Sequence, residues 1–439
     1  MNHKEKPQLK SIVRALRHRN FRLFFIGQGI SLIGTWMQSI ALGWLVYRLT
    51  HSAFLLGVVG FSGQIAVLLL APFAGVVADR RNRHSLLILT QVVAMAQAFV
   101  LSYLVLTETV MIWHVIALSL VLGSVNAFDI PVRQSFFIEM IEDKNDLGNA
   151  IALNSSVVNG ARLLGPSVAG LLIATVGEGL CFLINGLSYL AVIASLLLMR
   201  LVRKNVSPPG SRAWDDFTEG LKHVFLFEPI RAIILLLGLM SLMGMPYVVL
   251  MPLFAKDILH GGPSALGFLM GGCGVGALTG ALYLASRRGV LGLGKMIPIG
   301  ASIFGFGLIA FSLSSNLFLS LPLMTVIGFG QIIELAASNT LLQTIVDDEQ
   351  RGRVMGFFTV AFLGMAPIGS LIAGAMASVI GAPWTLFIGG VTCLIGAAAF
   401  ARKLPRLREK ARPIYVTRGI LPTIASGIEC GTGGTVPRK

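Results

Sequence analysis

Four ionisable side chains lie inside long apolar stretches of this sequence: Asp129, Arg133, Arg162 and Glu334. A charge is costly in such surroundings, so each is a candidate for function. Asp129 and Arg133 are four residues apart, which places them on one face of a helix and allows an ion pair. Two interpretations of the carboxyl groups remain open: either one of them carries a proton, or both are structural and are held by arginines.

Neighbours in the sequence distinguish these groups. Asp129 has Arg133 one helical turn away, which favours a structural or gating role. Glu334 has no basic residue within a turn, so we favour it as a proton or cation site. Glu334 also follows Asp129 by 205 positions, so the two carboxyl groups occupy equivalent places in two halves of the chain. Arg162 is either the partner of Asp129 or a group that binds an anion.

Amide and indole side chains on the apolar stretches are candidates for substrate binding. They offer hydrogen bonds and stacking surfaces to a bulky, partly polar compound, although any one of them fits packing as well as contact. The candidates are Gln28, Trp36, Gln38, Gln64, Asn126, Asn159 and Gln331.

The composition explains where these residues stand. The 439 residues are 55% hydrophobic and only 13% charged, which excludes a soluble protein of this size and predicts an all-α membrane protein. Apolar runs of about 20 residues, the length that crosses a bilayer, recur along the chain. We predict twelve spans, at 21–47, 54–78, 85–106, 110–135, 149–174, 179–199, 230–254, 265–286, 294–313, 317–342, 353–379 and 382–401.

The formal charge of +15 lies almost entirely on one side of the predicted spans. Of the 35 Lys and Arg residues, Arg48 and Lys256 lie near the other side and Arg162 lies inside a span. This asymmetry follows the positive-inside rule, so we predict a multi-pass membrane protein with an even number of spans and both termini in the cytoplasm. The charge indicates contact with membrane lipids and no nucleic-acid partner. The cysteines suggest no disulfide and no metal site.

An internal repeat divides the spans six and six. Residues 141–143 before span five match residues 346–348 before span eleven, and Gly170 matches Gly374. Six spans per half make the repeats parallel, which predicts a substrate site between the halves and transport by rocking one half against the other. We expect a basic cytoplasmic N-terminus, an N-terminal six-helix bundle, a cytoplasmic linker with an amphipathic segment, a C-terminal six-helix bundle and a cytoplasmic tail, at 1–20, 21–200, 201–229, 230–401 and 402–439.

The short connection between spans two and three is dense in charge. It contains Gly75, Asp79, Arg80 and Arg83 in the pattern Gly-x-x-x-Asp-Arg-x-x-Arg. The connection places an acidic residue at the end of one helix and arginines at the start of the next. This order is opposite to the one that the helix dipole favours. Another partner must therefore hold these charges.

Span five carries a second pattern, Gly165-Pro166-x-x-Ala169-Gly170. Its proline removes a helix hydrogen bond, and its small residues admit a neighbouring backbone. Together with the charged connection, this pattern resembles the major facilitator superfamily, specifically its twelve-span drug and proton antiporters. Within the superfamily, residues 129–134, Asp-Ile-Pro-Val-Arg-Gln, resemble the branch of the enterobactin exporter. The resemblance covers about residues 10 to 403 and implies two pseudo-symmetric six-helix bundles.

The resemblance also implies a gate. In the family the aspartate that matches Asp79 meets the start of span eleven, here near Arg353, and locks the cytoplasmic side in the outward-facing state. We therefore assign gating to Asp79, Arg80, Arg83 and Arg353, together with Gly75, Gly165, Pro166 and Gly170. Asn82 replaces the usual glycine of the connection, Ala169 replaces a common glycine of span five, and Ser286 replaces the aspartate in the second half. Only the first half can thus form the full charge network.

We predict a secondary transporter of the bacterial inner membrane and no enzyme. It would export a hydrophobic or amphiphilic drug-like molecule by alternating access in exchange for protons, with no cofactor and with the proton gradient as its energy source. Its partners would be the small-molecule substrate, protons and lipids, and we expect a monomer. A siderophore exporter, and a lysophospholipid transporter without proton coupling, are the alternatives. The chain shows neither the catalytic clusters of a membrane enzyme nor the soluble domain of a sensor, and it has no Walker-type phosphate loop.

Overall fold

The fold consists of helices joined by short turns. The computed structural model describes residues 13–141, 143–200, 226–287, 289–418 and 420. Within these ranges there are no strands, and twelve helical segments are long and apolar enough to cross a membrane. The predictions of an all-α membrane protein and of twelve spans are confirmed.

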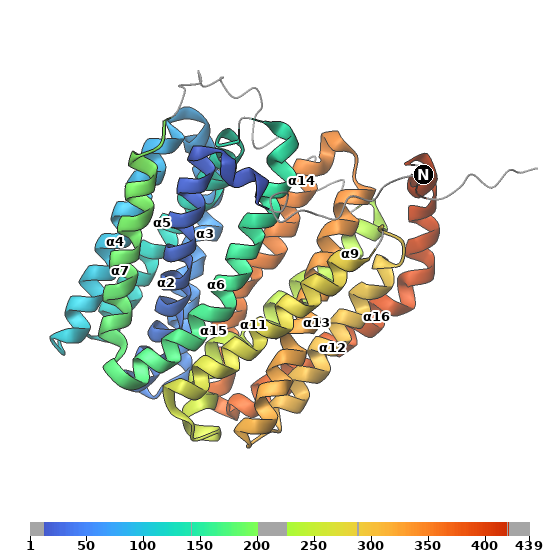
Figure 1. The fold of residues 1–439 in the computed structure, drawn as a ribbon. Coiled ribbons are helices and arrows are strands. Elements are labelled where there is room, and N and C mark those ends of the chain that lie inside the picture. Colours follow the sequence, from blue (N-terminus) through green and yellow to red (C-terminus); the bar gives the residue numbers. More distant parts are fainter. Residues whose placement is uncertain (1–12, 142, 201–225, 288, 419, 421–439) are drawn as a thin grey trace, which may run out of the picture.

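The first bundle contains six membrane-spanning helices, drawn from blue to green in Figure 1. Short 3₁₀ turns precede two of them, at Arg14–Arg17 (η1) and Lys144–Asp146 (η2). The spans are α2 (Arg19–Thr50), α3 (Ala53–Arg80), α4 (Arg83–Leu106), α5 (Ile112–Glu139), α6 (Leu147–Val176) and α7 (Glu178–Leu197).

The second bundle, drawn from yellow to red, also has six spans, but two of these contain π-helical segments. Its elements are α9 (Glu228–Leu239), η3 (Met240–Gly244), α10 (Tyr247–Leu253), η4 (Phe254–Ile258), α11 (Gly262–Ser286), α12 (Leu293–Ser312), α13 (Leu317–Ile345), α14 (Asp348–Thr359), η5 (Val360–Gly364), α15 (Met365–Ile380) and α16 (Ala382–Thr417). We call the membrane face where α2 begins and α16 ends the terminus face, and the other the opposite face.

Local sequence sets several helix ends. Asn82 caps α4, because its side-chain oxygen accepts hydrogen bonds from the backbone N–H groups of His84 and Ser85. Gly177 separates α6 from α7 and Gly381 separates α15 from α16, with φ of 82° and 85°. Left-handed φ values favour glycine. The two turns occupy equivalent places in the two halves, as the internal repeat requires.

The last helix is longer than the predicted span. The predicted start of the tail at 402 falls inside α16, which continues to Thr417. Leu407 and Ala411 are buried in this extension, and Arg406 and Lys410 form ion pairs with Glu228 at the start of α9, at 3.2 and 2.6 Å. Packing and charge pairing therefore stabilise a helix whose sequence is too polar to be recognised as a span.

Two glycine crossings join the bundles. A Cβ atom added to Gly170 on α6 would lie 2.8 Å from Cα of Gly267 on α11, and one added to Gly57 on α3 would lie 3.0 Å from Cα of Gly374 on α15. Only glycine allows backbones to approach this closely. Gly170 and Gly374 are the pair that the internal repeat relates, so the two crossings are themselves equivalent.

Both crossings lie nearer the opposite face than the terminus face. On the opposite face, the Tyr47 hydroxyl of α2 donates a hydrogen bond to the Asp257 carboxylate of η4, and Lys256 lies over the Tyr47 ring, 5.8 Å from its centroid. Arg48 pairs with Glu178 at 2.8 Å. Arg48 and Lys256, which depart from the positive-inside pattern, thus both have partners on this face.

Replacing Gly170 with alanine should weaken the contact between the bundles. The new methyl group would meet the Pro263 carbonyl oxygen at 2.7 Å as well as Gly267, and overpacking of this kind costs about 1–3 kcal/mol. Gly160→Ala on the same helix is the matched control, because a Cβ there meets nothing within 4 Å. The measurement is the melting temperature of the purified protein; equal melting of the two variants would contradict the proposed tight crossing.

Candidate functional site

A polar pocket lies inside the first bundle, between α2, α4, α5, α6 and α7. It holds about 280 Å³ and is lined by both hydrogen-bonding and apolar side chains. The polar lining consists of Gln28, Ser31, Thr35, Gln91, Asn126, Asp129, Arg133, Gln134, Asn154 and Tyr189. The side-chain oxygen of Gln28 is buried and accepts no hydrogen bond from any described residue. A buried acceptor without a partner is available to a ligand or a water molecule.

Asp129 is the centre of the polar contacts in this pocket. The side chain is buried, and Oδ1 accepts hydrogen bonds from Thr90 Oγ1 at 2.9 Å and from Gln91 Nε2 at 2.8 Å. Oδ2 forms an ion pair with Arg133, the neighbour four residues on. Asp129 therefore has one cationic partner and two hydrogen-bond donors among the neighbouring side chains.

Glu334 on α13 has a different environment. Its side chain is buried, and its one hydrogen bond among the described residues comes from Ser338 Oγ, at 3.1 Å. The niche around it holds only about 10 Å³, close to the space of one water molecule, and is lined mainly by Leu237, Met240, Met245, Phe304, Leu335 and Phe362. No described Lys or Arg pairs with Glu334. An ionised carboxylate there would lack a counter-charge, which is costly.

Two π-helical segments flank this niche. Ser241 of η3 donates a hydrogen bond from Oγ to the carbonyl oxygen of Phe362 in η5, at 2.5 Å. Both segments also contribute side chains to the niche. A π-segment interrupts the regular hydrogen-bond ladder of an α-helix and occurs frequently at functional sites. The helices on either side of Glu334 therefore meet where their backbones are least regular.

Arg162 does not reach Asp129 in this structure. Its guanidinium lies over the indole ring of Trp36, 5.3 Å from the ring centroid, in a cation–π contact between α6 and α2. Of the two open interpretations of Arg162, the one that makes it the partner of Asp129 is wrong in this conformation, because Arg133 takes that place. Trp36 is likewise occupied by a protein contact.

The predicted substrate-binding residues do not form one cluster. Gln28 and Asn126 line the polar pocket, whereas Gln38 is buried among protein partners. Gln38 donates to Gln97 Oε1 at 3.1 Å and accepts from Asn185 Nδ2 at 2.6 Å. Both ends of its side-chain amide are therefore hydrogen-bonded to other protein side chains.

The remaining amides lie elsewhere. Asn159 donates to the backbone oxygen of Ser155 on its own helix, at 2.8 Å. Gln331 lines the Glu334 niche and accepts a hydrogen bond from the Tyr247 hydroxyl at 3.3 Å. Gln64 is half-buried on α3 and does not line the polar pocket.

The predicted gating residues are only partly described. Gly75, Asp79 and Arg80 belong to α3 by their backbone, and the side chains of Asp79 and Arg80 lie outside the described part of the structure. Arg83 begins α4 and pairs with Glu139 at the end of α5, at 2.6 Å. Arg353 is half-buried on α14. Gly165, Pro166 and Gly170 are all buried on α6.

Two six-helix bundles, related by an internal repeat and joined at equivalent glycine crossings, define a membrane transporter of the major facilitator type. Residues 10–417 match the model of a family described as transmembrane secretion effectors, so the chain belongs to this family of the superfamily. The fold resembles a solved bacterial homologue of the human lysosomal transporter Spinster, in an inward-facing and unoccupied conformation. That likeness has a TM-score of 0.69 at 14% identity and covers 90% of this chain and 98% of the other.

Curated relatives include transporters of several cargoes. The staphyloferrin A transporter of Staphylococcus aureus is 26% identical over 85% of this chain and 93% of its own length. The multidrug efflux pump Tap of Mycolicibacterium fortuitum is 26% identical over 86% and 93%. The macrolide efflux protein A of Streptococcus pyogenes is 24% identical over 90% and 98%.

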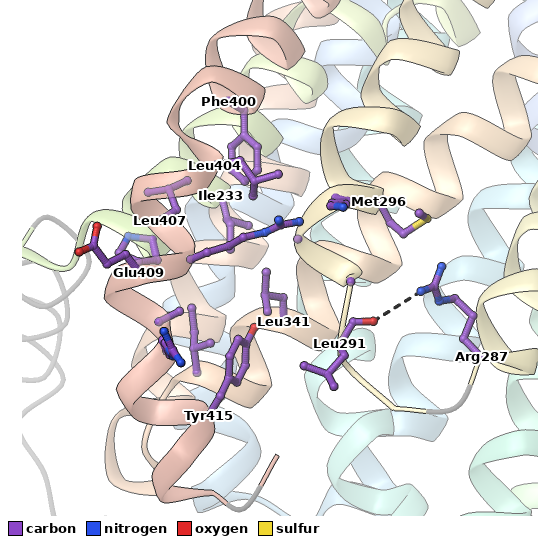
Figure 2. Close-up of a pocket in the computed structure, with 18 residues that line it drawn as sticks. Ile233, Arg287, Leu291, Met296, Leu341, Phe400, Leu404, Leu407, Glu409 and Tyr415 are labelled. Atoms are coloured by element: carbon purple, nitrogen blue, oxygen red, sulfur yellow. Dashed lines mark hydrogen bonds between the residues drawn. The ribbon is translucent and has the colours of Figure 1, made fainter. Parts of the chain in front are cut away.

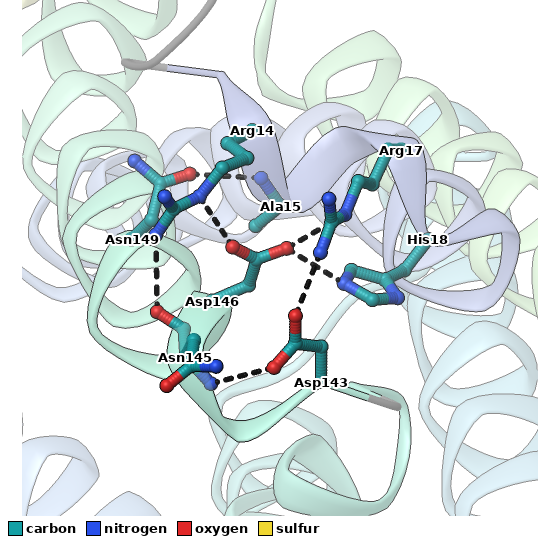
Figure 3. Close-up of polar contacts among 8 residues, drawn as sticks. All are labelled: Arg14, Ala15, Arg17, His18, Asp143, Asn145, Asp146 and Asn149. Carbon is teal, nitrogen blue, oxygen red and sulfur yellow. Dashed lines mark hydrogen bonds and ion pairs between the residues drawn. The ribbon is translucent and has the colours of Figure 1, made fainter.

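One charged cluster was not predicted as a unit. Figure 3 shows Asp146, just before α6, surrounded by three basic side chains from the start of the chain. Asp146 pairs with Arg14, with Arg17 at 2.8 Å and with His18 at 3.0 Å, and its side chain is only 1% exposed. Arg17 also bonds to Asp143 at 2.9 Å. The basic run was visible in the sequence, but its acidic partner lies more than a hundred residues away.

Burial alone would raise the pKa of Asp146. The hydrogen bond from His18 and the charges of Arg14 and Arg17 outweigh burial and hold the pKa of this carboxyl below its usual range. The folded pKa is therefore lower than the unfolded one. Its stabilising contribution is present above the ordinary carboxyl pKa of about 3.9 and is lost as the pH falls through the folded value.

We expect Asp146→Asn to lower the melting temperature at neutral pH, because it removes the charge that holds Arg14, Arg17 and His18. The melting deficit relative to the unchanged protein should shrink as the pH falls below about 3.9, where Asp146 becomes protonated in the unfolded chain, and should vanish below the lower pKa of the folded state. Thermal unfolding followed across a pH series measures both effects. Asp143→Asn, which removes a more exposed carboxylate from the same cluster, serves as the control and should produce a smaller deficit.

Proposed function

We propose that this protein exports a hydrophobic or amphiphilic small molecule from a bacterial cell by alternating access, in exchange for protons. The proposal combines the transporter family with the two contrasting carboxyl groups. It includes no catalytic role and no bound cofactor, because the proton gradient would supply the energy.

The proposed substrate class rests on the relatives and on the polar pocket. Two of the relatives are an efflux pump for several drugs and a macrolide efflux protein. The pocket combines amide and hydroxyl groups with apolar side chains such as Leu32, Leu122 and Val158, a lining suited to a compound with both apolar and hydrogen-bonding parts. We assign Gln28 and Asn126 to substrate contact in this pocket.

The observation that carries proton exchange is the contrast between Asp129 and Glu334. Asp129 has a cation and two donors as fixed partners, which suits a structural or gating role. Glu334 has one hydroxyl donor in a mainly apolar niche. Burying an ionised carboxylate there, without a counter-charge, would cost free energy. Movement of the flanking π-segments would change its access to water. This combination suits a group that binds and releases a proton during the transport cycle.

Orientation is proposed from charge. Nearly all Lys and Arg residues lie in the parts of the sequence that flank the terminus-face ends of the spans. We therefore place this face in the cytoplasm of an inner-membrane protein. The bundles pack most closely toward the opposite face, as expected for a state open to the cytoplasm. In the alternate state, Asp79 and the start of α14 would close the terminus face.

Siderophore export is the second candidate. A staphyloferrin A transporter is among the relatives, and Arg133 in the polar pocket offers a cation near any anionic group that enters it. Transport assays with a macrolide and with a carboxylate siderophore, run in the same proteoliposomes, would distinguish the two cargoes.

Glu334→Gln should abolish proton-driven transport while preserving the fold. Glutamine keeps the shape and the contact with Ser338 but cannot lose a proton. The measurement is uptake of a macrolide into inverted proteoliposomes with an imposed pH gradient. We expect at least a tenfold loss of gradient-driven uptake, with exchange of macrolide in the absence of a gradient retained.

Asp129→Asn tests the contrasting role in the same assay. It leaves Arg133 without its counter-charge, so we expect a loss of stability of about 1–3 kcal/mol and reduced transport that still responds to the pH gradient. Transport indifferent both to the gradient and to Glu334→Gln would refute proton coupling.

The gate predicts an asymmetry between the halves. Asp79→Asn should reduce transport several-fold, because it removes the acid that would meet the start of α14. Ser286→Ala, at the equivalent place in the second half, should have little effect, since among the described residues Ser286 Oγ donates to the Tyr283 carbonyl of its own helix, at 2.7 Å. Initial transport rates of the two variants provide the comparison, and equal losses would contradict the assignment.

A further inference from the structure

A large groove opens at the terminus face of the second bundle, far from the polar pocket. It holds about 680 Å³ and lies between the α16 extension, the start of α12, the end of α13 and the start of α9. Figure 2 shows α16 on one side of the groove and the loop before α12 on the other. The volume falls in the range of about 300–1,000 Å³ that is usual for ligand sites.

The floor of the groove is apolar. It is made of side chains from four helices, α9, α12, α13 and α16, and these helices continue into the membrane-spanning part of the bundle. These side chains are Ile233, Met296, Leu341, Ile345, Phe400 and Leu404. A surface of this kind, at the end of membrane helices, can receive the first part of an acyl chain.

The rim of the groove is basic. Arg287, Lys295, Arg408 and Arg412 line it, against one carboxylate, that of Glu409. In Figure 2 the Glu409 carboxylate points away from Met296 and the floor. Among the described residues, Arg287 donates hydrogen bonds to two neutral oxygens, those of Tyr283 and Leu291, each at 3.4 Å.

These four cations have no acidic partner within the described part of the chain. Their neighbours on the same helix do: Arg406 and Lys410 both pair with Glu228. The α16 extension thus directs one set of cations to a protein carboxylate and another set, Arg408 and Arg412, to the groove. Cations gathered over an apolar floor repel one another unless an anion lies among them.

We propose that this groove binds an anionic phospholipid from the adjacent leaflet. Its phosphate would lie among Arg287, Lys295, Arg408 and Arg412, where charge-assisted hydrogen bonds are strong. Its acyl chains would begin along the apolar floor near Phe400 and Leu404. Basic pockets between membrane helices are known to hold anionic head groups, and an occupant with both a charged and an apolar part matches both surfaces at once.

The proposal has a consequence for the second bundle. A lipid seated in the groove would bridge the α16 extension to α12 and α9, elements that otherwise surround an open space there. Binding only to the folded state raises stability by mass action. The protein should therefore be more stable in anionic lipid, independently of transport and of proton coupling.

The experiment measures lipid retention and melting of the full-length protein. Purified protein is exchanged into phosphatidylcholine nanodiscs with or without phosphatidylglycerol, and bound lipid is counted by native mass spectrometry. We expect retained phosphatidylglycerol and a higher melting temperature in its presence. The double variant Arg408→Gln/Arg412→Gln should weaken phosphatidylglycerol binding at least about tenfold, since each cation near an anionic head group contributes on the order of 1 kcal/mol.

The matched control removes two cations from the same helix outside the groove, as Arg402→Gln/Lys403→Gln. Both residues are exposed and do not line the groove. This variant should bind phosphatidylglycerol as the unchanged protein does. Equal weakening in both double variants would overturn the proposal in favour of general surface attraction.

Three further outcomes would overturn the proposal. Equal retention of phosphatidylcholine would mean that the head-group charge is not recognised. Equal protection by glycerol 3-phosphate would indicate a free-anion site. Stronger lipid binding after removal of residues 421–439 would mean that the chain's own tail fills the groove. If the double variant fails to fold, Lys295→Gln on α12 provides the same test from the other side of the groove.

Discussion

Close backbone contact between the two bundles is the constraint on which the rest of this structure depends. Inside a membrane, apolar surfaces gain little by leaving lipid, so helices hold together through close packing. Here that packing is concentrated at Gly170 with Gly267 and at Gly57 with Gly374, two contacts related by the internal repeat. A bundle that rocks against its partner can do so about these crossings without separating. The Tyr47–Asp257 hydrogen bond adds a side-chain contact between the bundles on the same side.

The intramembrane charges are accommodated in three different ways around this frame. Asp129 is neutralised by Arg133, and Arg162 rests on the indole of Trp36. Glu334 alone has neither a cation nor more than one donor among the described residues. A fixed ion pair resists change, whereas a lone carboxyl group responds to any movement that admits water. The π-segments η3 and η5 beside Glu334 interrupt the regular helical hydrogen bonding there, as is frequent at functional sites.

Sequence patterns predicted the features that depend on local spacing. Hydropathy identified twelve spans, and a four-residue interval identified the Asp129–Arg133 pair. Contacts between distant residues were not visible: Gln38 was expected to face substrate, but Gln97 and Asn185 satisfy its amide from other helices. The π-segments were missed because one extra residue per turn leaves hydropathy unchanged. The groove was not predicted because the polar end of α16 was assigned to the cytoplasmic tail and not to a helix.

Each bundle has a basic segment at its terminus face. The two bundles differ in which group neutralises the positive charge of that segment. In the first bundle, Arg14 and Arg17 lie against Asp146, a buried carboxylate of the chain itself. In the second, Arg408 and Arg412 face a groove whose one carboxylate points away from the floor. Since both segments lie at the membrane surface, the same electrostatic requirement can be met from within the protein or from the lipid. The first solution is independent of the membrane, whereas the second makes the stability of the C-terminal bundle depend on lipid composition.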